Sequence, residues 1–236
     1  MSPSVAIMQP YVFPYLGYFC LVDASDVFVF YDDVHFIQKG WIHRNRIALQ
    51  GQAHTFSIPL AQRSQNVLIA DTQTHDFPAF RSKFIKQLEQ GYRKASHFRQ
   101  GMAYVLDVLE PPHDSIADLA ARSVEQACRL MGLSRRFARS SHAFADSRGM
   151  ARAQRLIHIT RQLGATDYVN ATGGRTLYEP ADFAEHGVRL RFVDPQLPDY
   201  PQFADQTFVP NLSVIDAFMH NPASTVRDMV QSYELN

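Results

Sequence analysis

The sequence predicts an α/β fold, with a mainly parallel Rossmann-like sheet and helices on both of its faces. Two apolar segments, residues 5–8 and 26–31, are expected to be strands on either side of a helix at about residues 15–25. The alternation of strand and helix returns after residue 137. Strands that alternate with helices form a parallel sheet covered by those helices. An inserted β-hairpin and a helical block at about residues 77–131 separate the two sheet-forming halves.

The composition bounds the class of protein. The 236 residues, 46% of them hydrophobic, suffice for one globular domain over residues 1–236. The 23 basic and 23 acidic residues cancel, which excludes a global field that recruits nucleic acid or an anionic membrane. No apolar run approaches the roughly 20 residues that span a bilayer, and Pro10 and Pro14 interrupt any signal peptide. We therefore expect a cytoplasmic protein in which Cys20 and Cys128 are buried thiols.

The first half of the chain continues with a hairpin and three helices. A turn that contains glycine joins residues 46–49 to residues 54–58. Asp114 or Ser115 is expected to cap the third helix, and Gly132 to end it. Apolar residues at helical spacing predict the helices at residues 77–90, 102–109 and 116–131.

The second half alternates strands with helices and ends in two helices. The order of the strands in the sheet does not follow from the sequence. The predicted strands are residues 137–140, 167–170 and 188–193, and the predicted helices are residues 150–163, 179–185, 213–220 and 223–233.

Aromatic residues and prolines crowd the loop after the first strand. Proline stiffens such a turn, and ligands of open α/β sheets bind beyond the carboxyl ends of the strands. We therefore expect Gln9, Tyr11 and Tyr18 to contact substrate. The alternative is an aromatic cluster that only packs against the sheet.

The second strand ends in Asp32 and Asp33. A carboxylate at a strand end can bind a sugar hydroxyl, hold a hydrated Mg²⁺ or act as a general base. Adjacent strand residues point to opposite faces, so at most one of the two faces a pocket. With Lys39 they are the candidate catalytic residues; the alternative for the aspartates is a solvated turn or a helix cap.

The segment 39–46 places the only tryptophan among cationic side chains. Arg44 offers a planar fork for phosphate or carboxylate, and Trp41 can stack on a sugar or a base. On a strand, Arg44 and Arg46 share one face and Asn45 takes the other. We expect Trp41, Arg44 and Asn45 to bind an anionic substrate, with an ordinary solvated edge strand as the alternative.

Small residues followed by Arg175 and Tyr178 come directly after the predicted strand at residues 167–170. Such a loop suits phosphate or carboxylate binding, although a plain Gly-Gly turn also explains it. We include Arg175 and Tyr178 among the substrate-binding candidates.

The last candidates are Gln202, Asn211 and Asp216, in and after a long irregular segment. Long loops without regular structure are often functional. Asp216 also fits a capping box with Ser213, which is the structural alternative.

Metal and cofactor motifs are absent from the sequence. The ten histidines and two cysteines lack the spacing of a metal site, so we expect no metal. A P-loop, a nucleophile elbow and a dinucleotide-binding glycine motif are absent as well. The sequence therefore indicates no particular cofactor.

The first 31 residues also resemble nucleotidyltransferases with an H-x-G-H loop, with Tyr15 and Tyr18 at the two histidine positions. Neutral tyrosines cannot supply the positive charge that those histidines give to a pentavalent phosphate. This resemblance therefore implies the topology more than the activity.

Several longer motifs resemble those of the WbqC-like protein family. The resemblance covers nearly the whole chain. It is found in I-M-Q-P-Y-x-F-P-Y-x-G-Y-F from Ile7, S-D-V-F-V-x-Y-D-D-V from Ser25, K-G-W-I-x-R-N-R-I from Lys39, L-G-A-T-D-Y from Leu163 and F-x-P-N-L-S-V-I-D from Phe208. The family occurs with genes for surface polysaccharide, such as O-antigen, and for modified sugars, so the resemblance implies an enzyme-like protein of glycan biosynthesis.

These observations favour an enzyme, a small transferase that acts on an activated sugar or a similar anionic metabolite. Acyl or aminoacyl transfer to an amino sugar is one form of this activity. The alternatives are a diverged nucleotidyltransferase and a non-catalytic binding or scaffold protein of polysaccharide assembly. The expected partner is a small anionic molecule and not nucleic acid. The donor, the metal requirement and the oligomeric state, a homodimer included, stay open.

Overall fold

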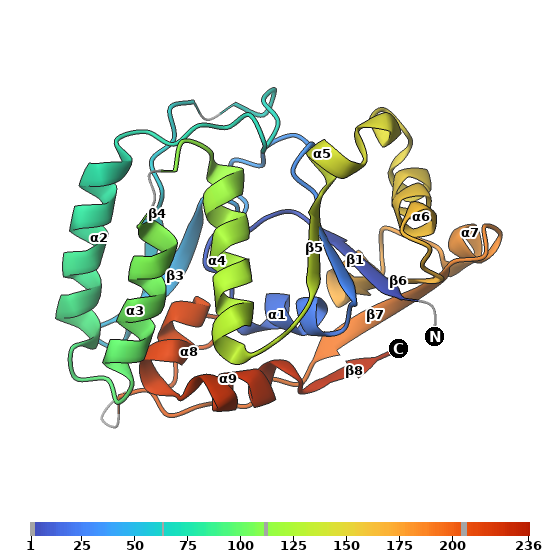
Figure 1. Cartoon of the computed structure of the whole chain (residues 1–236). Coiled ribbons are helices and arrows are strands. Elements are labelled where there is room, and N and C mark those ends of the chain that lie inside the picture. The colour runs from blue at the N-terminus through green and yellow to red at the C-terminus, as the bar shows by residue number, and fades with distance from the viewer. Residues whose placement is uncertain (1–2, 63, 111–112, 204–206) are drawn as a thin grey trace.

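A mainly parallel sheet forms the centre of the molecule, as the sequence predicts. The structure is a computed structural model that describes residues 3–62, 64–110, 113–203 and 207–236. Within these ranges the strands pair in the order β5-β2-β1-β6-β7-β8, and β8 alone is antiparallel to its neighbour (Figure 1). The strands are β1 (Ser4–Met8), β2 (Val27–Phe30), β5 (Arg136–Arg139), β6 (Asp167–Ala171), β7 (Arg189–Pro195) and β8 (Tyr233–Leu235).

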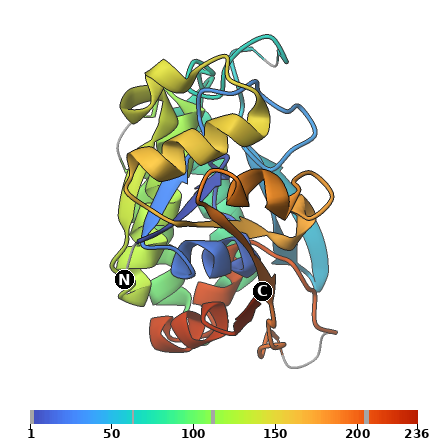
Figure 2. The same cartoon turned by 90° about the vertical axis from the view of Figure 1, so that its right-hand side faces the viewer.

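Successive side chains of the strands pack on opposite faces of the sheet. Val5 and Ile7 of β1 pack with α6 (Arg152–Gln162) and α7 (Pro180–Ala184), which lie in front of the strands in Figure 2. Ala6, Phe28 and Phe30 belong to a second core on the other face. Burial of one such phenylalanine stabilises the fold by about 1.5–3 kcal/mol. That core includes α1 (Leu16–Asp23), α4 (Ile116–Met131), α8 (Val214–His220) and α9 (Ala223–Val230).

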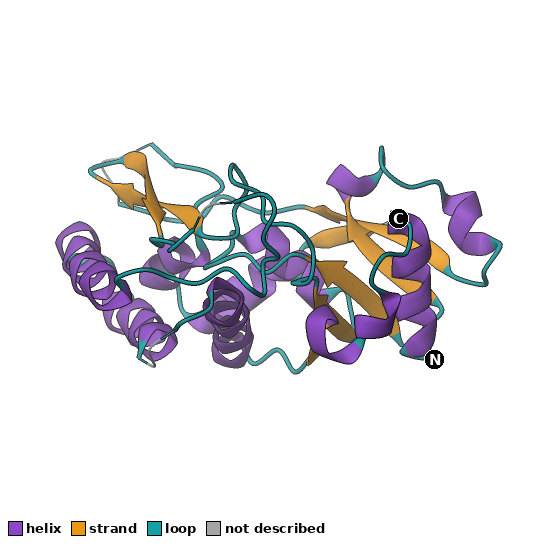
Figure 3. Ribbon diagram, turned by 90° about the horizontal axis from the view of Figure 1, so that it is seen from above, coloured by secondary structure: helices purple, strands orange, loops and turns teal. Residues whose placement is uncertain are grey.

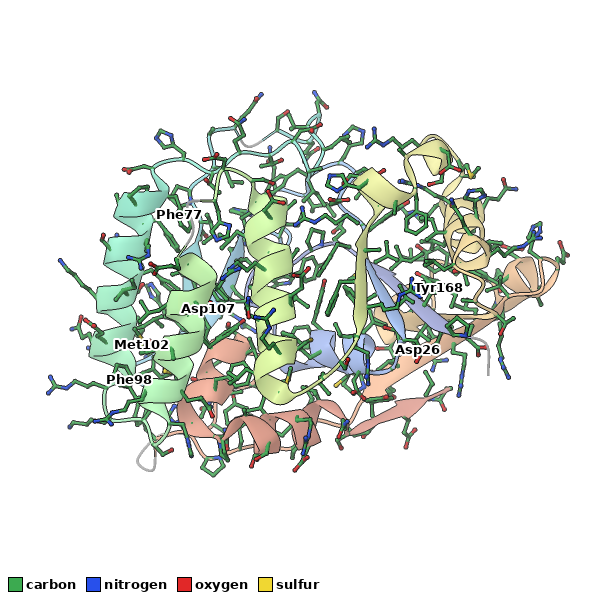
Figure 4. The ribbon with its side chains drawn as sticks, in the orientation of Figure 1. Asp26, Phe77, Phe98, Met102, Asp107 and Tyr168 are labelled. Atoms are coloured by element: carbon green, nitrogen blue, oxygen red, sulfur yellow. The ribbon has the colours of Figure 1, made fainter. Side chains whose placement is uncertain are left out.

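The hairpin and the helical block lie beyond the sheet. The hairpin strands β3 (Arg44–Leu49) and β4 (Gln52–Ser57) are clearly separate from the main sheet in Figure 3. The helices α2 (Phe77–Tyr92) and α3 (Phe98–Leu109) form the block with α4. In Figure 4, Phe77, Phe98 and Met102 mark this end of the molecule, opposite Tyr168 on β6. The predicted cap and stop of α4 are confirmed, since the Ser115 hydroxyl accepts from the Asp118 N–H and Gly132 has a φ of 72°.

Two predictions for the C-terminal segment are wrong. The helix expected to reach residue 233 ends at Val230, and residues 233–235 pair as β8 with the end of β7. Ser213 caps α8 through the N–H of Ile215, while its own N–H donates to the Arg46 carbonyl, so no capping box forms with Asp216. Both differences come from contacts with segments distant in sequence. The remaining elements are α5 (Ser140–Ala143), η1 (Ala145–Ser147) and η2 (Thr172–Gly174).

Within the described ranges, no helix has both the length and the apolar character that crossing a membrane requires. Cys20 and Cys128 are free and buried, as expected. Burial raises the pKa of both thiols to about 12, so neither is a thiolate nucleophile near neutral pH.

Candidate active site

The order of the parallel strands locates the site. From β1 the chain adds β2 and β5 on one side of the sheet, and then β6 and β7 on the other side of β1. The connections therefore change direction between β1 and β6. In open α/β sheets this switch point leaves a crevice at the carboxyl ends of the strands, where ligands bind.

Two adjoining cavities lie at this switch point. We call them the Arg152 cavity, of about 590 Å³, and the Trp41 cavity, of about 480 Å³. Met8 at the end of β1, Ala171 at the end of β6 and Gly173 line both. Together the two cavities form one cleft with two lobes.

The Arg152 cavity contains most of the titratable groups of the cleft. Arg152 is exposed and forms no ion pair within the described part of the chain. Burial raises the pKa of Tyr31 and of Tyr178, and the nearby Arg152 guanidinium opposes this rise in both. The polar side chains on its wall include Gln9, Asp33, His35, Arg152, Asn170 and Tyr178.

Asp33 is the member of the aspartate pair that lines the cavity, and two arginines neutralise it. Arg155 Nη2 and Arg148 Nε donate to Asp33 Oδ2 at 2.6 and 3.0 Å, and the Ser140 hydroxyl donates to Oδ1. Burial raises the pKa of Asp33, but the hydrogen bonds from Arg155, Ser140 and Arg148 outweigh it, and the pKa lies below its ordinary value. Asp33 is therefore a persistent anion and a weak proton acceptor.

Asp32 lines neither cavity of the cleft. Its carboxylate accepts hydrogen bonds from the N–H and the hydroxyl of Ser141, at 2.9 and 2.8 Å. Its own N–H donates to the Ser140 hydroxyl at 3.1 Å. Asp32 thus fixes the junction of β5 and α5 to the end of β2.

The Gly-Gly turn after β6 has a specific steric reason. A Cβ on Gly174 would lie 2.4 Å from Nδ2 of Asn170, so the Asn170 amide occupies the space of a side chain at position 174. Asn170 Oδ1 accepts from the N–H of Ala171 at 2.8 Å. The Arg175 guanidinium stacks on the Phe192 ring, 4.7 Å from its centroid, and does not line either cavity.

Aromatic side chains and one arginine line the Trp41 cavity. Arg46 lies 5.6 Å from the centroid of the Trp41 ring, and its Nη2 donates to the Asn211 carbonyl at 3.1 Å. Arg46 Nε is buried and has no hydrogen-bond partner among the described residues. Asn211 has a φ of 56°. The aromatic residues on this wall are Tyr11, Tyr15, Tyr18 and Trp41.

Tyr18 and Asn45 line this cavity but also hold the loop after β1. The Tyr18 hydroxyl donates to the Gln9 carbonyl at 2.9 Å. Asn45 Nδ2 donates to the carbonyls of Val12 and Phe13 at 3.3 and 2.9 Å. These bonds place the aromatic loop over the carboxyl end of the sheet.

Other predicted residues lie outside the cleft. Arg44 donates to the carbonyls of Gly40 and Lys39 at 3.0 and 2.6 Å, so it holds its own loop, and Lys39 lines neither cavity. Arg44 and Arg46 do share one face of β3, and both lie close to the Trp41 ring.

Asp216 and Gln202 form a separate buried cluster. Tyr92 donates to Asp216 Oδ1 at 2.8 Å, and Tyr200 and Gln202 donate to Oδ2 at 2.7 and 2.9 Å. Burial raises the pKa of Asp216 above its ordinary value despite these hydrogen bonds. The cluster joins α2, the segment before α8 and α8 itself, and it does not border the cleft.

A third cavity, of about 680 Å³, lies between the hairpin and α2. It is larger than either lobe, but it shares no lining residue with them, and none of the described residues that line it is an aspartate or a glutamate. Size alone does not make a site, so we assign the function to the cleft.

Sequence reasoning did not select several residues that line the cleft. Tyr15, Arg46 and Asn170 belong to segments that were singled out, so their neighbourhood was the available signal. His35 and Arg152 belong to no motif of the sequence, and the packing of α6 against the end of β2 brings Arg152 and Arg155 to the cleft. In the described part of the chain, no group of three or more His, Cys, Asp or Glu residues could hold a metal ion.

The fold and the cleft define an α/β protein with a ligand crevice at a Rossmann-type switch point. A model of the WbqC-like protein family matches residues 9–228, so the chain belongs to that family. The chain is 28% identical over 222 residues to the uncharacterized protein Rv1507c of Mycobacterium tuberculosis, covering 90% of this chain and 91% of that protein. No solved structure matches the chain significantly.

Proposed function

We propose that this protein is a transferase which acts on an activated sugar or a similar anionic metabolite in glycan or modified-sugar biosynthesis. The observation that carries the proposal is the cleft with two adjoining lobes at the switch point between β1 and β6. Two lobes with a shared wall suit two substrates, whose reacting groups meet near Met8 and Gly173. A binding protein for one small ligand needs only one lobe.

The two lobes differ in chemistry, which suggests different occupants. The Trp41 cavity offers aromatic faces and the Arg46 guanidinium, a combination that suits a sugar with an attached phosphate or carboxylate. The Arg152 cavity offers an unpaired guanidinium, an imidazole and the Asn170 amide. We assign the acceptor sugar to the Trp41 cavity and the donor to the Arg152 cavity.

The proton of the reaction has one good acceptor in the cleft. When an acceptor hydroxyl or amine attacks the donor, it loses a proton as the new bond forms and the leaving group departs. His35 is exposed and lines the Arg152 cavity, and imidazole is the side chain that most often serves as a general base. We assign the proton transfer to His35, and to Asp33 the positioning of Arg155 and Arg148.

The test is product formation from defined pairs of substrates. The purified protein is incubated with amino-sugar nucleotides and acyl or aminoacyl donors, and products are identified by mass spectrometry. His35→Gln is expected to lower kcat by about 10²–10⁴-fold. Arg152→Gln is expected to raise KM for the donor, while Arg161→Gln on the exposed face of the same helix changes neither constant. Absence of any transfer product with the wild-type protein contradicts the proposal.

A diverged nucleotidyltransferase is the second candidate, and one observation favours it. Tyr15 and Tyr18 both line the Trp41 cavity at the start of α1, at the positions of the two histidines of an H-x-G-H loop. Calorimetry with ATP and CTP in the presence of Mg²⁺ separates the two candidates. Heat of binding and release of pyrophosphate favour the second candidate, and no heat with either nucleotide removes it.

A further inference from the structure

The exposed apolar side chains of this protein gather on the cleft. In the described part of the chain the large apolar side chains that are exposed are Tyr15, Ile37, Trp41, Leu106, Met150 and Leu177. Tyr15 and Trp41 line the Trp41 cavity. Ile37, Met150 and Leu177, which are 48%, 40% and 57% exposed, line the Arg152 cavity. Only Leu106 of these six lies elsewhere.

The three aliphatic side chains come from three different loops. Ile37 follows β2, Met150 precedes α6, and Leu177 lies between η2 and α7. A single exposed apolar residue needs no explanation, but several that converge from distant segments mark a surface that a ligand covers. Leu68, from a fourth segment, lines the same cavity and is half-buried.

The two lobes also differ in the kind of apolar group they present. The apolar side chains of the Trp41 cavity are mainly aromatic, and the rim of the Arg152 cavity is aliphatic. Beside this rim, Arg152 has no carboxylate partner among the described residues. A cation next to an exposed aliphatic rim complements a molecule with an aliphatic chain and a negative charge near one end.

We propose that the Arg152 cavity binds the aliphatic chain of a substrate that carries an anionic group, with the chain against Ile37, Met150 and Leu177 and the anionic group at Arg152. This rests on the proposed function, because it assigns the donor an acyl or alkyl chain. The flexible thioether of Met150 adapts to chains of different shape.

The test uses straight-chain carboxylates of four to ten carbons, below their micelle concentrations, and the matching 1-alkanols. Calorimetry measures Kd for each with the wild-type protein. We expect carboxylate affinity to rise by about fourfold per methylene until the cavity is filled. The alkanols are expected to follow the same trend with lower affinity, because they lack the charge that Arg152 binds.

Three variants separate the contributions of chain and charge. Leu177→Ser removes an exposed side chain, so the protein is expected to fold, and it should reduce the gain in affinity per methylene. Arg152→Gln should remove the preference for carboxylate over alkanol and leave the dependence on chain length. Leu106→Ser, on the exposed face of α3, is the matched control and should behave as the wild type.

Two outcomes overturn the inference. One is a carboxylate affinity that does not depend on chain length, and the other is a chain-length dependence that is equal in the wild type and Leu177→Ser. These outcomes are distinct from failure of the proposed function. Chain-length-dependent binding without any transfer product contradicts only the transferase. Transfer from a donor without an aliphatic chain, with no carboxylate binding, contradicts only this inference.

Discussion

Arg155 Nη2 donates to Asp33 Oδ2 at 2.6 Å and joins the first turn of α6 to the end of β2, across 122 residues of sequence. The two side chains are almost completely buried. Arg155 also lies 4.7 Å from the centroid of the Tyr31 ring, and its Nε donates to the Ser147 hydroxyl. The pair fixes one wall of the Arg152 cavity.

Removal of one partner of this pair is expected to be strongly destabilising. Asp33→Asn leaves the Arg155 charge buried and without its counter-ion, which costs about 3–5 kcal/mol of unfolding free energy. Urea denaturation of Asp33→Asn, Arg155→Met and the double variant measures the coupling. We expect the double variant to lose less than the sum of the single losses. Additive losses would mean that the two side chains do not stabilise each other.

The pH dependence of stability should have opposite signs at two buried aspartates. The pKa of Asp33 lies below its ordinary value of 3.8, so below about pH 4 the unfolded chain binds more protons at this site than the folded chain. Its contribution to stability is therefore present above this range and is lost as the pH falls. Burial raises the pKa of Asp216, so the folded chain binds more protons there, and its contribution falls as the pH rises through that pKa.

The measurement is the unfolding free energy from pH 2.5 to pH 7 for the wild type, Asp33→Asn and Asp216→Asn. The unfolding free energy of the wild type should gain a contribution from Asp33 as the pH rises out of the acid range, and Asp33→Asn should lack this gain. The contribution of Asp216 to the unfolding free energy should decline as the pH rises above 4, and Asp216→Asn should lack this decline. Differences of the same sign for both variants contradict these assignments.

Gly174 should not tolerate a side chain, whereas Gly173 should. The Cβ of Gly174→Ala would lie 2.4 Å from Asn170 Nδ2, and a Cβ at position 173 would meet no atom within 4 Å. We expect Gly174→Ala to cost about 1–3 kcal/mol through overpacking, and Gly173→Ala to change the unfolding free energy by less than about 0.5 kcal/mol. Thermal and urea unfolding of both variants check this. Equal losses of unfolding free energy in the two variants would mean that the backbone, and not the contact with Asn170, causes the destabilisation.

Trp41 should report ligand binding in the Trp41 cavity. It is the only tryptophan of the chain and is 39% exposed, so a molecule that covers its ring changes the emission. We expect titration with a sugar nucleotide to shift the emission maximum of the wild type to shorter wavelength. Arg46→Gln should weaken this response by about tenfold or more, because a charged hydrogen bond contributes about 1.5–3 kcal/mol. An unchanged Kd in Arg46→Gln contradicts the role of Arg46.

Much of the fold could be predicted from local patterns. The hairpin, the helices of the block and the parallel strands follow from apolar periodicity, and the ends of α4 follow from Ser115 and Gly132. The order of the strands could not be predicted, because it depends on pairing between distant segments. The strand β8 was missed for the same reason, since it exists only through its pairing with the end of β7.

The sequence singled out several residues that line the cleft, some near strand ends and others in loops. Gln9, Asp33, Trp41, Tyr178 and Asn211 all line the cleft. Lys39, Arg44 and Arg175 carry the right charge, but each lies outside it.

Sequence shows which charges lie near a strand end and not which of them stay free. Arg44 is held by backbone carbonyls, whereas Arg152, the first residue of α6, lines the cavity and forms no ion pair in the described part of the chain.

The most direct test is a crystal structure of the protein with the sugar nucleotide or acyl donor that raises its melting temperature most. The cleft between β1 and β6 is expected to hold the ligand, with its anionic group in contact with Arg152 or Arg46. Ligand density in the cavity between the hairpin and α2, with the cleft empty, would contradict the account.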